Sequence, residues 1–273
     1  MLAHAPHCGQ NEGVSGGMRR VDLNADVGES TGAVRHGDDE GVMPFITSAN
    51  IACGFHAGDP AVMRATVALA RAHGVSVGAH PGFQDLAGFG RRELAVSPQE
   101  AEDLVAYQVG ALAGIAAAQG VRLTHVKPHG ALYNMAARDR ALADAVVRGV
   151  RAVDAGLVVF GLSGSALVAS ALAAGMRAAS EAFSDRGYLA NGSLAPRNMA
   201  GAVVSDPDLV AQRAMAMVLE QQVIAVDGAA VALSVDTLCV HGDTPGAGEL
   251  AASLRAGLQS AGIAVAAPER ESA

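Results

Sequence analysis

The chain has 273 residues, of which 51% are hydrophobic, 3% are aromatic and none is tryptophan. This length accommodates one large α/β domain, and a core of small aliphatic side chains suits helices packed closely on a parallel sheet. A formal net charge of −8 with dispersed arginines is not typical of a nucleic-acid-binding surface, and no apolar run of about 20 residues is present to span a membrane.

Residues 1–20 are polar and lack the apolar core of a signal peptide, so we expect a disordered leader followed by a single barrel domain over residues 21–273. The cysteines at positions 8, 53 and 239 form no CxxC pair. That usage is typical of a reducing compartment, so we expect the cytoplasm.

From residue 21 onward, short apolar segments alternate with longer segments of helical periodicity. Strands are expected at residues 21–24, 48–53, 75–79, 157–160, 178–182, 236–240 and 263–266, with one more ending at Lys127. Helices are expected at residues 60–72, from 97, from 131, at 139–150, 165–174 and 207–221, and before the last strand. Asp59-Pro60, Asp206-Pro207 and the capping box Ser97–Glu100 mark helix starts. Seven or eight βα units in about 250 residues predict an α/β fold with a single seven- or eight-stranded parallel (β/α) barrel; an open doubly wound sheet is the alternative.

The stretch 125–130, His-Val-Lys-Pro-His-Gly, contains the only lysine of the chain, Lys127. Pro128 removes a ladder donor and favours an extended residue before it, so the strand should end at Lys127. Because lysine offers a compact, titratable ammonium that arginine does not, we interpret Lys127 as functional rather than as a leftover strand-end residue. Alanine at this position is expected to abolish turnover without affecting folding.

Polar side chains recur at or just after the expected strand ends. They are Asn24, Asp26, His56, His80, Lys127, His129, Glu181, Asp185, Arg186, His241 and Asp243. Because parallel strands end at the same edge, these residues should converge on one site. For His80 and His125, a structural role is at least as good an interpretation as catalysis. Cys53 is expected to be a buried small residue. One of Asp22, Asn24 and Asp26 is expected only to satisfy backbone donors.

Five motifs, at residues 22–29, 50–59, 78–82, 125–134 and 181–186, resemble those of the LamB/YcsF family. The resemblance covers about residues 21–265. It implies one component of an ATP-dependent 5-oxoprolinase, a hydrolase that opens the cyclic amide of 5-oxoproline to L-glutamate as ATP becomes ADP and phosphate, together with subunits B and C. It also implies a barrel related to the glycoside hydrolases and carbohydrate deacetylases, in which Asp26, His56 and His129 would be the metal ligands. The adjacent double aspartate of those deacetylases is absent here. His125 and His129 have the HxxxH spacing of those enzymes, but they lie on a strand-turn rather than on a helix.

We therefore assign roles as a hypothesis. The expected catalytic residues are Asp26, His56, Lys127, His129 and Glu181. The expected substrate-binding residues are Asn24, Asn50, His80, Arg186, His241 and Asp243. The two carboxylates are candidate bases, Lys127 or Arg186 would bind a carboxylate or phosphoryl group, and the histidines would move protons or bind a metal.

The nucleotide site is not apparent from the sequence. No G-x-x-x-x-G-K-[ST] motif is present, although Ser163-Gly164-Ser165 could hold a phosphate at a helix start. ATP would bind here in another way or the phosphorylating step would belong to a partner. Two other functions remain open: a stand-alone metal-dependent deacetylase or amidohydrolase, and a non-catalytic protein of the complex that carries the substrate.

Overall fold

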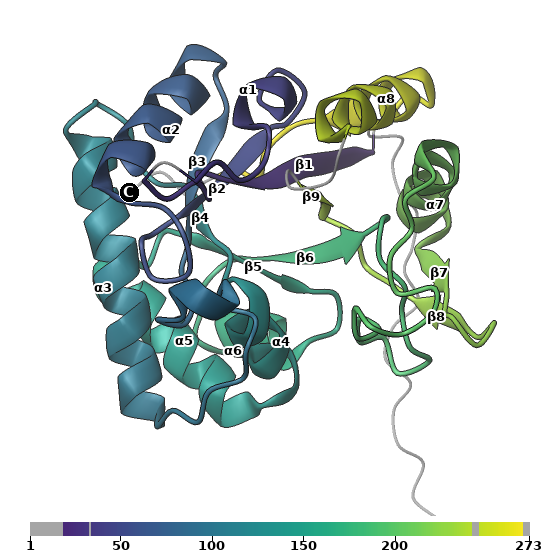
Figure 1. Ribbon diagram of the computed structural model, residues 1–273. Coiled ribbons are helices and arrows are strands. Elements are labelled where there is room, and N and C mark those ends of the chain that lie inside the picture. Colours follow the sequence, from purple (N-terminus) through teal and green to yellow (C-terminus); the bar gives the residue numbers. More distant parts are fainter. Residues whose placement is uncertain (1–18, 33, 242–245, 270–273) are drawn as a thin grey trace, which may run out of the picture.

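The computed structural model describes residues 19–32, 34–241 and 246–269, so residues 1–18 of the expected leader lie outside the described part. Seven parallel strands form a closed barrel, because β1 pairs with both β2 and β9 (Figure 1). The barrel strands are β1 Arg20–Val27, β2 Ser48–Ala52, β3 Ser76–His80, β4 His125–Val126, β5 Val158–Leu162, β6 Ala178–Phe183 and β9 Thr237–His241. The parallel barrel expected from the sequence is confirmed, and the open doubly wound sheet is wrong.

The short strand β10, Ala264–Val265, extends the sheet beside the start of β1 and lies outside the closed ring. It corresponds to the last strand expected from the sequence. Strand β4 is shorter than expected and ends at Val126. The Lys127 N–H still donates to the Ala79 carbonyl (2.9 Å), so pairing with β3 continues as far as Pro128 allows.

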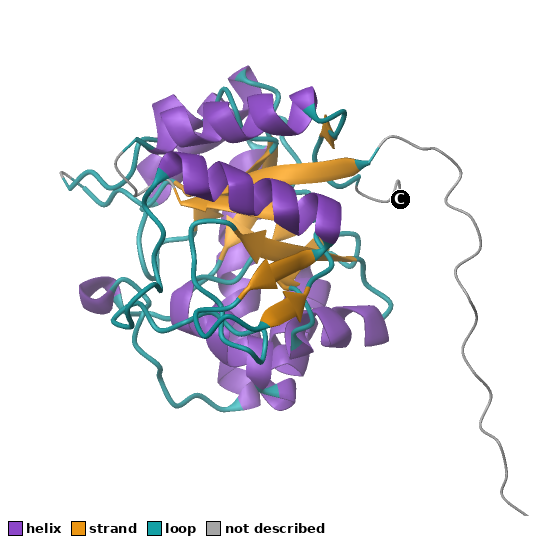
Figure 2. Cartoon of the chain, turned by 90° about the vertical axis from the view of Figure 1, so that its right-hand side faces the viewer, coloured by secondary structure: helices purple, strands orange, loops and turns teal. Residues whose placement is uncertain are grey.

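Helices surround the barrel, as Figures 1 and 2 show. They are α1 Asp39–Val42, α2 Pro60–Ala72, α3 Pro98–Ala117, α4 Gly130–Arg138, α5 Arg140–Val153, α6 Ala166–Ala173, α7 Pro207–Glu220 and α8 Ala247–Ser260. The Asp59 side chain accepts hydrogen bonds from two N–H groups of α2, and Ser97 and Glu100 form the expected capping box of α3. Among the described helices, none is both long and apolar enough to cross a membrane.

Small residues allow the helices to pack closely on the barrel and on one another. Helices α3 and α5 are neighbours, and a Cβ at Gly149 would lie 2.6 Å from the Glu102 carbonyl oxygen. A side chain larger than hydrogen at this contact would separate the two backbones. The aliphatic core expected from the composition therefore depends on close backbone approach as well as on apolar area.

The segment between β6 and β9 leaves the barrel and was predicted only in part. Helix α7 was expected, but the antiparallel hairpin of β7 Gln222–Ile224 and β8 Ala230–Ala232 was not. This excursion projects from one side of the barrel in Figure 1. Residues 189–198, which precede α7, contribute to the cavity at the barrel mouth.

Candidate active site at the carboxyl edge of the barrel

Strand β1 carries three polar side chains at alternate positions, Asp22, Asn24 and Asp26, which therefore face the barrel interior. Asp22 lies deepest and accepts hydrogen bonds from the hydroxyls of Thr47 (2.6 Å) and Ser48 (2.7 Å) and from Thr237. Burial raises the pKa of Asp22 to about 6, and these hydroxyls only partly oppose the shift. Asp22 thus satisfies neighbouring donors, but these are side-chain hydroxyls rather than the backbone donors that were expected.

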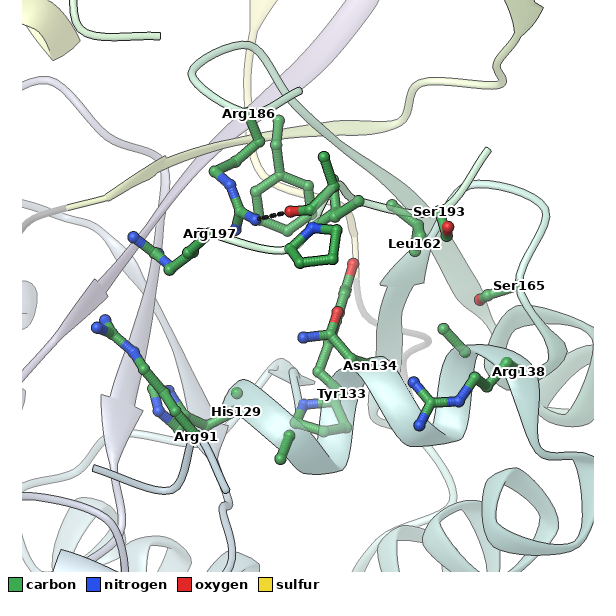
Figure 3. Close-up of a pocket in the computed structure, with 18 of the residues that line it drawn as sticks. Arg91, His129, Tyr133, Asn134, Arg138, Leu162, Ser165, Arg186, Ser193 and Arg197 are labelled. Atoms are coloured by element: carbon green, nitrogen blue, oxygen red, sulfur yellow. Dashed lines mark hydrogen bonds between the residues drawn. The ribbon is translucent and has the colours of Figure 1, made fainter. Parts of the chain in front are cut away.

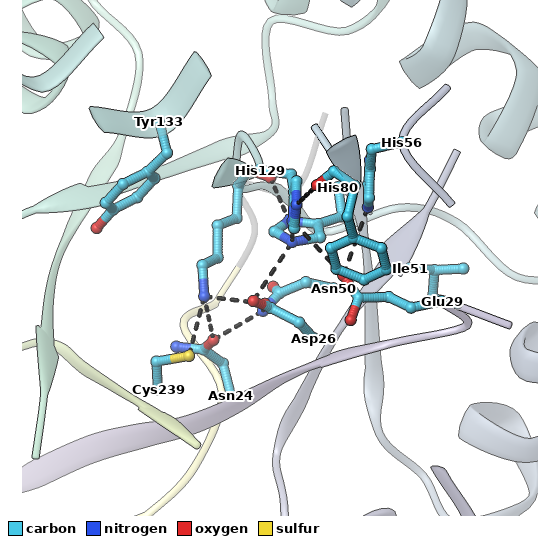
Figure 4. Close-up of polar contacts among 12 residues, drawn as sticks. Asn24, Asp26, Glu29, Asn50, Ile51, His56, His80, His129, Tyr133 and Cys239 are labelled. Carbon is cyan, nitrogen blue, oxygen red and sulfur yellow. Dashed lines mark hydrogen bonds and ion pairs between the residues drawn. The ribbon is translucent and has the colours of Figure 1, made fainter. Parts of the chain in front are cut away.

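Lys127 lies at the centre of a polar cluster that includes Asn24, Asp26 and Cys239, which Figure 4 labels. Its Nζ is 2.9 Å from Asp26 Oδ1 and 2.8 Å from Glu181 Oε1. Asn24 Oδ1 lies at 3.3 Å and Cys239 Sγ at 3.0 Å. Burial alone would lower the pKa of Lys127, but the negative charges around it outweigh burial and hold the pKa well above its usual range. The ammonium therefore stays charged and neutralises a buried group of acids.

Glu181 is completely buried and uses both carboxylate oxygens. Its Oε1 accepts a hydrogen bond from Asn24 Nδ2 (2.9 Å) as well as the ion pair from Lys127. Its Oε2 accepts a hydrogen bond from the Tyr133 hydroxyl (2.7 Å). Burial and the adjacent carboxylate raise the pKa of Tyr133 well above its usual range. Tyr133 lies on α4 and lines the cavity, so it is a site residue that the sequence interpretation missed.

Three histidines from neighbouring strand ends form a second cluster beside Asp26. The His56 and His129 rings stack with centroids 3.8 Å apart, and His80 Nε2 lies 2.9 Å from His129 Nδ1. Glu29 Oε1 is 3.4 Å from His56 Nε2 and 3.5 Å from His129 Nδ1. Burial, together with neighbouring positive groups, holds the pKa of both His56 and His129 well below the usual range. These two imidazoles are therefore neutral at neutral pH.

His125 lies behind the site and connects it to the barrel wall. Its Nε2 donates to Asn50 Oδ1 (2.8 Å), and Asn50 Nδ2 then donates to Asn24 Oδ1 (2.7 Å) and Asp26 Oδ1 (2.8 Å). Burial lowers the pKa of His125 to about 3, which keeps the ring neutral. The ring occupies space beside Gly78, where a Cβ would approach it to 2.2 Å. His125 thus has the structural contacts that the sequence allowed for it.

A loop after β3 covers the histidines from the solvent side. Phe89 adopts a left-handed conformation (φ 53°), and its carbonyl accepts a hydrogen bond from His129 Nε2 (2.8 Å). The next residue, Gly90, has φ 63°, and a Cβ there would lie 2.7 Å from His56 Cβ. Gly90 therefore allows the loop to close tightly over the stacked rings.

The clusters open into a cavity of about 850 Å³ at the barrel mouth. Figure 3 shows Arg186 and Arg197 on one side of this cavity, with His129 and Tyr133 across from them. The arginines lining it are Arg91, Arg138, Arg186 and Arg197. Arg186 is held by the carbonyls of Ala195 (2.8 Å) and Ala202 (3.0 Å), and burial lowers its pKa from the usual value. The cavity wall thus combines four arginines with the carboxylates of Asp26, Glu29 and Glu93, of which Glu93 pairs with Arg138 (2.6 Å).

The structure places most of the sequence-derived candidates around this cavity, at different depths. Lining it are Asp26, His80, Lys127, His129 and Arg186. Beneath it lie Asn24, Asn50, His56 and Glu181, all buried. The His241 backbone pairs in register with Asp26, while Asp243 lies outside the described residues. Asp185 is buried, and Cys53 is a buried thiol, as expected.

A buried amine, carboxylates and imidazoles beneath the carboxyl-edge opening of a parallel barrel define the architecture of a barrel enzyme. The family model of LamB/YcsF matches residues 21–273, and the chain belongs to this family. Its relatives include the 5-oxoprolinase A component of Bordetella pertussis, 58% identical over 90% of this chain and 98% of the relative. The same name is carried by a Tolumonas auensis protein, 55% identical over 92% of this chain and 100% of the relative.

Comparison with solved structures supports the fold, and in one case the family as well. The lactam utilization protein from Thermus thermophilus superposes with a TM-score of 0.86 at 51% identity, covering 91% of this chain and 100% of that one. A putative cellobiose-phosphate cleavage protein from Enterococcus faecalis superposes with a TM-score of 0.53 at 13% identity, covering 92% of this chain and 97% of that one. The second likeness extends to the fold alone.

Proposed function

We propose that the chain acts as the A component of an ATP-dependent 5-oxoprolinase, which hydrolyses the lactam of 5-oxoproline to L-glutamate. The observation that carries the proposal is the Lys127–Asp26–Glu181 cluster, which opens into an arginine-lined cavity at the barrel mouth. The high identity to relatives that carry the 5-oxoprolinase name supports the substrate. A lactam is a stable amide, so its opening requires activation of the carbonyl, a deprotonated water and protonation of the ring nitrogen.

The cavity offers binding groups suited to an anionic substrate. 5-Oxoproline carries one carboxylate, which Arg186 or its neighbours at the rim would bind, because a guanidinium matches carboxylate geometry. The cavity of about 850 Å³ exceeds what so small a molecule fills. The remaining space and the other arginines are available for a phosphoryl group or for a segment of a partner protein.

The two buried carboxylates beside Lys127 differ in their access to the cavity. Asp26 lies at the floor of the cavity, with its Oδ1 held by Lys127 (2.9 Å) and Asn50 (2.8 Å) and its Oδ2 3.4 Å from His80 Nε2. Asp26 is therefore the best-placed base for a water molecule, since Glu181 is closed off beneath it. The same carboxyl group would then return the proton to the leaving nitrogen of the ring.

The assembled enzyme in this proposal contains this chain and 5-oxoprolinase subunits B and C, uses ATP, and works in the cytoplasm. The relatives are named as one lettered component of 5-oxoprolinase, which supports the existence of partners. Buried free thiols at Cys53 and Cys239 agree with a reducing compartment. The lysine-containing phosphate loop of P-loop enzymes is absent from the sequence, so in this proposal the nucleotide is bound without it.

The test is reconstitution of the chain with subunits B and C, following glutamate and phosphate release with and without ATP. We expect ATP-dependent turnover that Asp26→Asn reduces by at least about 100-fold, the lower range for loss of a general base. The exposed His73, changed to Gln, is the matched control and should leave turnover unchanged. Full turnover by Asp26→Asn would indicate a protein that only carries substrate, and amide hydrolysis by the isolated chain without ATP would indicate a stand-alone amidohydrolase. Either result would contradict the proposal.

A further inference from the structure

Glu29, His56, His80 and His129 bring four potential metal-ligand atoms within 4.8 Å of one another. All four side chains are buried, and they come from the ends of β1, β2, β3 and β4, which are adjacent in the barrel. Figure 4 shows the imidazoles of His56, His80 and His129 grouped beside Glu29. The four residues form a compact donor set at the edge of the cavity.

The His80 and His129 rings meet edge-on, with an interplanar angle of 86° and one ring nitrogen of each close to the other. His80 Nδ1 lies 2.7 Å from the Lys127 carbonyl, and His129 Nε2 lies 2.8 Å from the Phe89 carbonyl. Because a carbonyl oxygen can only accept, both of these nitrogens carry hydrogen. The other two nitrogens, His80 Nε2 and His129 Nδ1, are then acceptors, yet they are 2.9 Å apart. Such a pair is completed by a positive centre that both nitrogens can face, either a bound metal ion or a proton carried by one of the two rings.

His56 provides a second, independent observation. Both of its ring nitrogens are buried and have no hydrogen-bond partner among the described residues. Leaving a buried polar group unsatisfied is costly, so the retention of this side chain needs a compensating role. Its Nε2 points to the same carboxylate oxygen, Glu29 Oε1 (3.4 Å), that His129 Nδ1 approaches (3.5 Å).

We propose that Glu29, His56, His80 and His129 bind one divalent first-row transition-metal ion, with zinc as the best fit to the donors. Three imidazoles and one carboxylate are the ligand types that such ions prefer, whereas Mg²⁺ and Ca²⁺ prefer oxygen. In metal sites, the imidazole nitrogen that does not bind the ion usually donates to a carbonyl or a carboxylate, which orients the ring. The carbonyls of Lys127 and Phe89 have this position beside His80 and His129.

This ligand set differs from the one that the family resemblance implied, because Glu29 takes the place of Asp26. Asp26 Oδ1 already pairs with Lys127 and accepts from Asn50. Glu29, His80 and His129 line the cavity, so a bound ion would face the substrate space. There it would polarise a carbonyl oxygen or a water molecule. Metal binding does not depend on the proposed lactam chemistry.

The experiment measures metal binding by the whole chain without any assay of turnover. Chelator-treated protein is titrated with Zn²⁺ by calorimetry and with Co²⁺ by visible absorption, and the melting temperature is followed. We expect one ion per chain, a Co²⁺ spectrum of nitrogen-rich low coordination, and a rise in melting temperature with free metal.

The variants test the ligand set. Glu29→Gln and His56→Gln should weaken metal binding by at least about 100-fold. This exceeds the usual loss when the replaced residue only hydrogen-bonds to a metal ligand. Asp26→Asn should weaken it less than Glu29→Gln, and His73→Gln, which changes an exposed histidine, should leave it unchanged. A wild-type chain that binds no stoichiometric ion would overturn the proposal, even if the variants fail to fold. A larger loss for Asp26→Asn than for Glu29→Gln would overturn the choice of Glu29.

Discussion

Replacing Lys127 by methionine tests the charge balance of the site most directly. The change removes the ammonium but keeps the length and apolar stem of the side chain. Asp26 and the completely buried Glu181 then lose their ion pairs at 2.9 and 2.8 Å. At an effective dielectric constant of about 20, Coulomb's law gives about 6 kcal/mol for each contact. Desolvation of the charges cancels much of this, and removal of one partner from a buried pair costs about 3–5 kcal/mol.

We expect Lys127→Met to lower the free energy of unfolding by about 5 kcal/mol, at the upper end of that range, because two carboxylates lose one shared partner. Urea denaturation followed by circular dichroism measures this. The burial and contacts of Lys127 thus change the expectation that its loss would abolish turnover and leave folding intact. An activity assay of a Lys127 variant is therefore interpretable only when the stability of the same variant has been measured.

A double-mutant cycle tests whether unpaired buried charge causes the loss of stability in Lys127→Met. In the Lys127→Met background, Glu181→Gln removes one unpaired charge and should recover about 2–3 kcal/mol relative to its effect in the wild type. Arg148→Met, which removes an exposed ion pair with Glu102 (2.6 Å), is the matched control and should cost less than about 1 kcal/mol. A loss below about 1 kcal/mol for Lys127→Met, or equal effects of Glu181→Gln in both backgrounds, would refute the electrostatic reasoning.

Three further variants probe other contacts. Tyr133→Phe removes the hydroxyl that donates to a buried carboxylate (2.7 Å) and should cost about 1.5–3 kcal/mol in the same urea assay, while loss of turnover without loss of stability would contradict this. Gly78→Ala places a Cβ 2.2 Å from the His125 ring and should cost at least about 1–3 kcal/mol, whereas Gly114→Ala, on an exposed and open part of α3, should stabilise by up to about 1 kcal/mol. Asp22 has a pKa of about 6 in the folded chain against 3.8 normally, so the folded state binds its proton more tightly and this group's contribution to stability rises as the pH falls through 6. The stability of wild type minus that of Asp22→Asn should therefore increase by about 1 kcal/mol from pH 7 to pH 5, and a constant difference would show that the pKa is unperturbed.

Local signals in the sequence were sufficient for the barrel. Asp59-Pro60 and the Ser97 capping box start helices where the structure has them, because these side chains satisfy the first N–H groups of a helix in any tertiary context. The hairpin of β7 and β8 was missed, because its two three-residue strands are too short for a clear alternating pattern. The convergence of Asp26, Lys127 and Glu181 followed from topology, since parallel strands share one carboxyl edge.

Two site residues, Tyr133 and Glu29, were not predicted from the sequence, and each omission has a physical reason. Tyr133 occupies a helical position typical of a core aromatic, and only the fold shows that its hydroxyl reaches Glu181. Glu29 belongs to the same motif as Asp26, but it lies beyond Gly28, whose φ of 68° turns the chain after β1. This turn aims Glu29 at the histidines while Asp26 stays with Lys127. The division of two nearby carboxylates between two clusters is therefore a property of backbone geometry that residue spacing does not reveal.

The same geometry gives a new reason for the only lysine of the chain. The sequence suggested a group chosen for its ability to lose a proton, whereas the pKa of Lys127 is raised by its neighbours. Its Nζ has three oxygen neighbours, on Asn24, Asp26 and Glu181, between 2.8 and 3.3 Å away. An ammonium is compact and directs three hydrogens to separate acceptors, while a guanidinium is planar and larger. Lysine is therefore favoured here because it is a small permanent charge that holds two acids and an amide in place beneath the cavity.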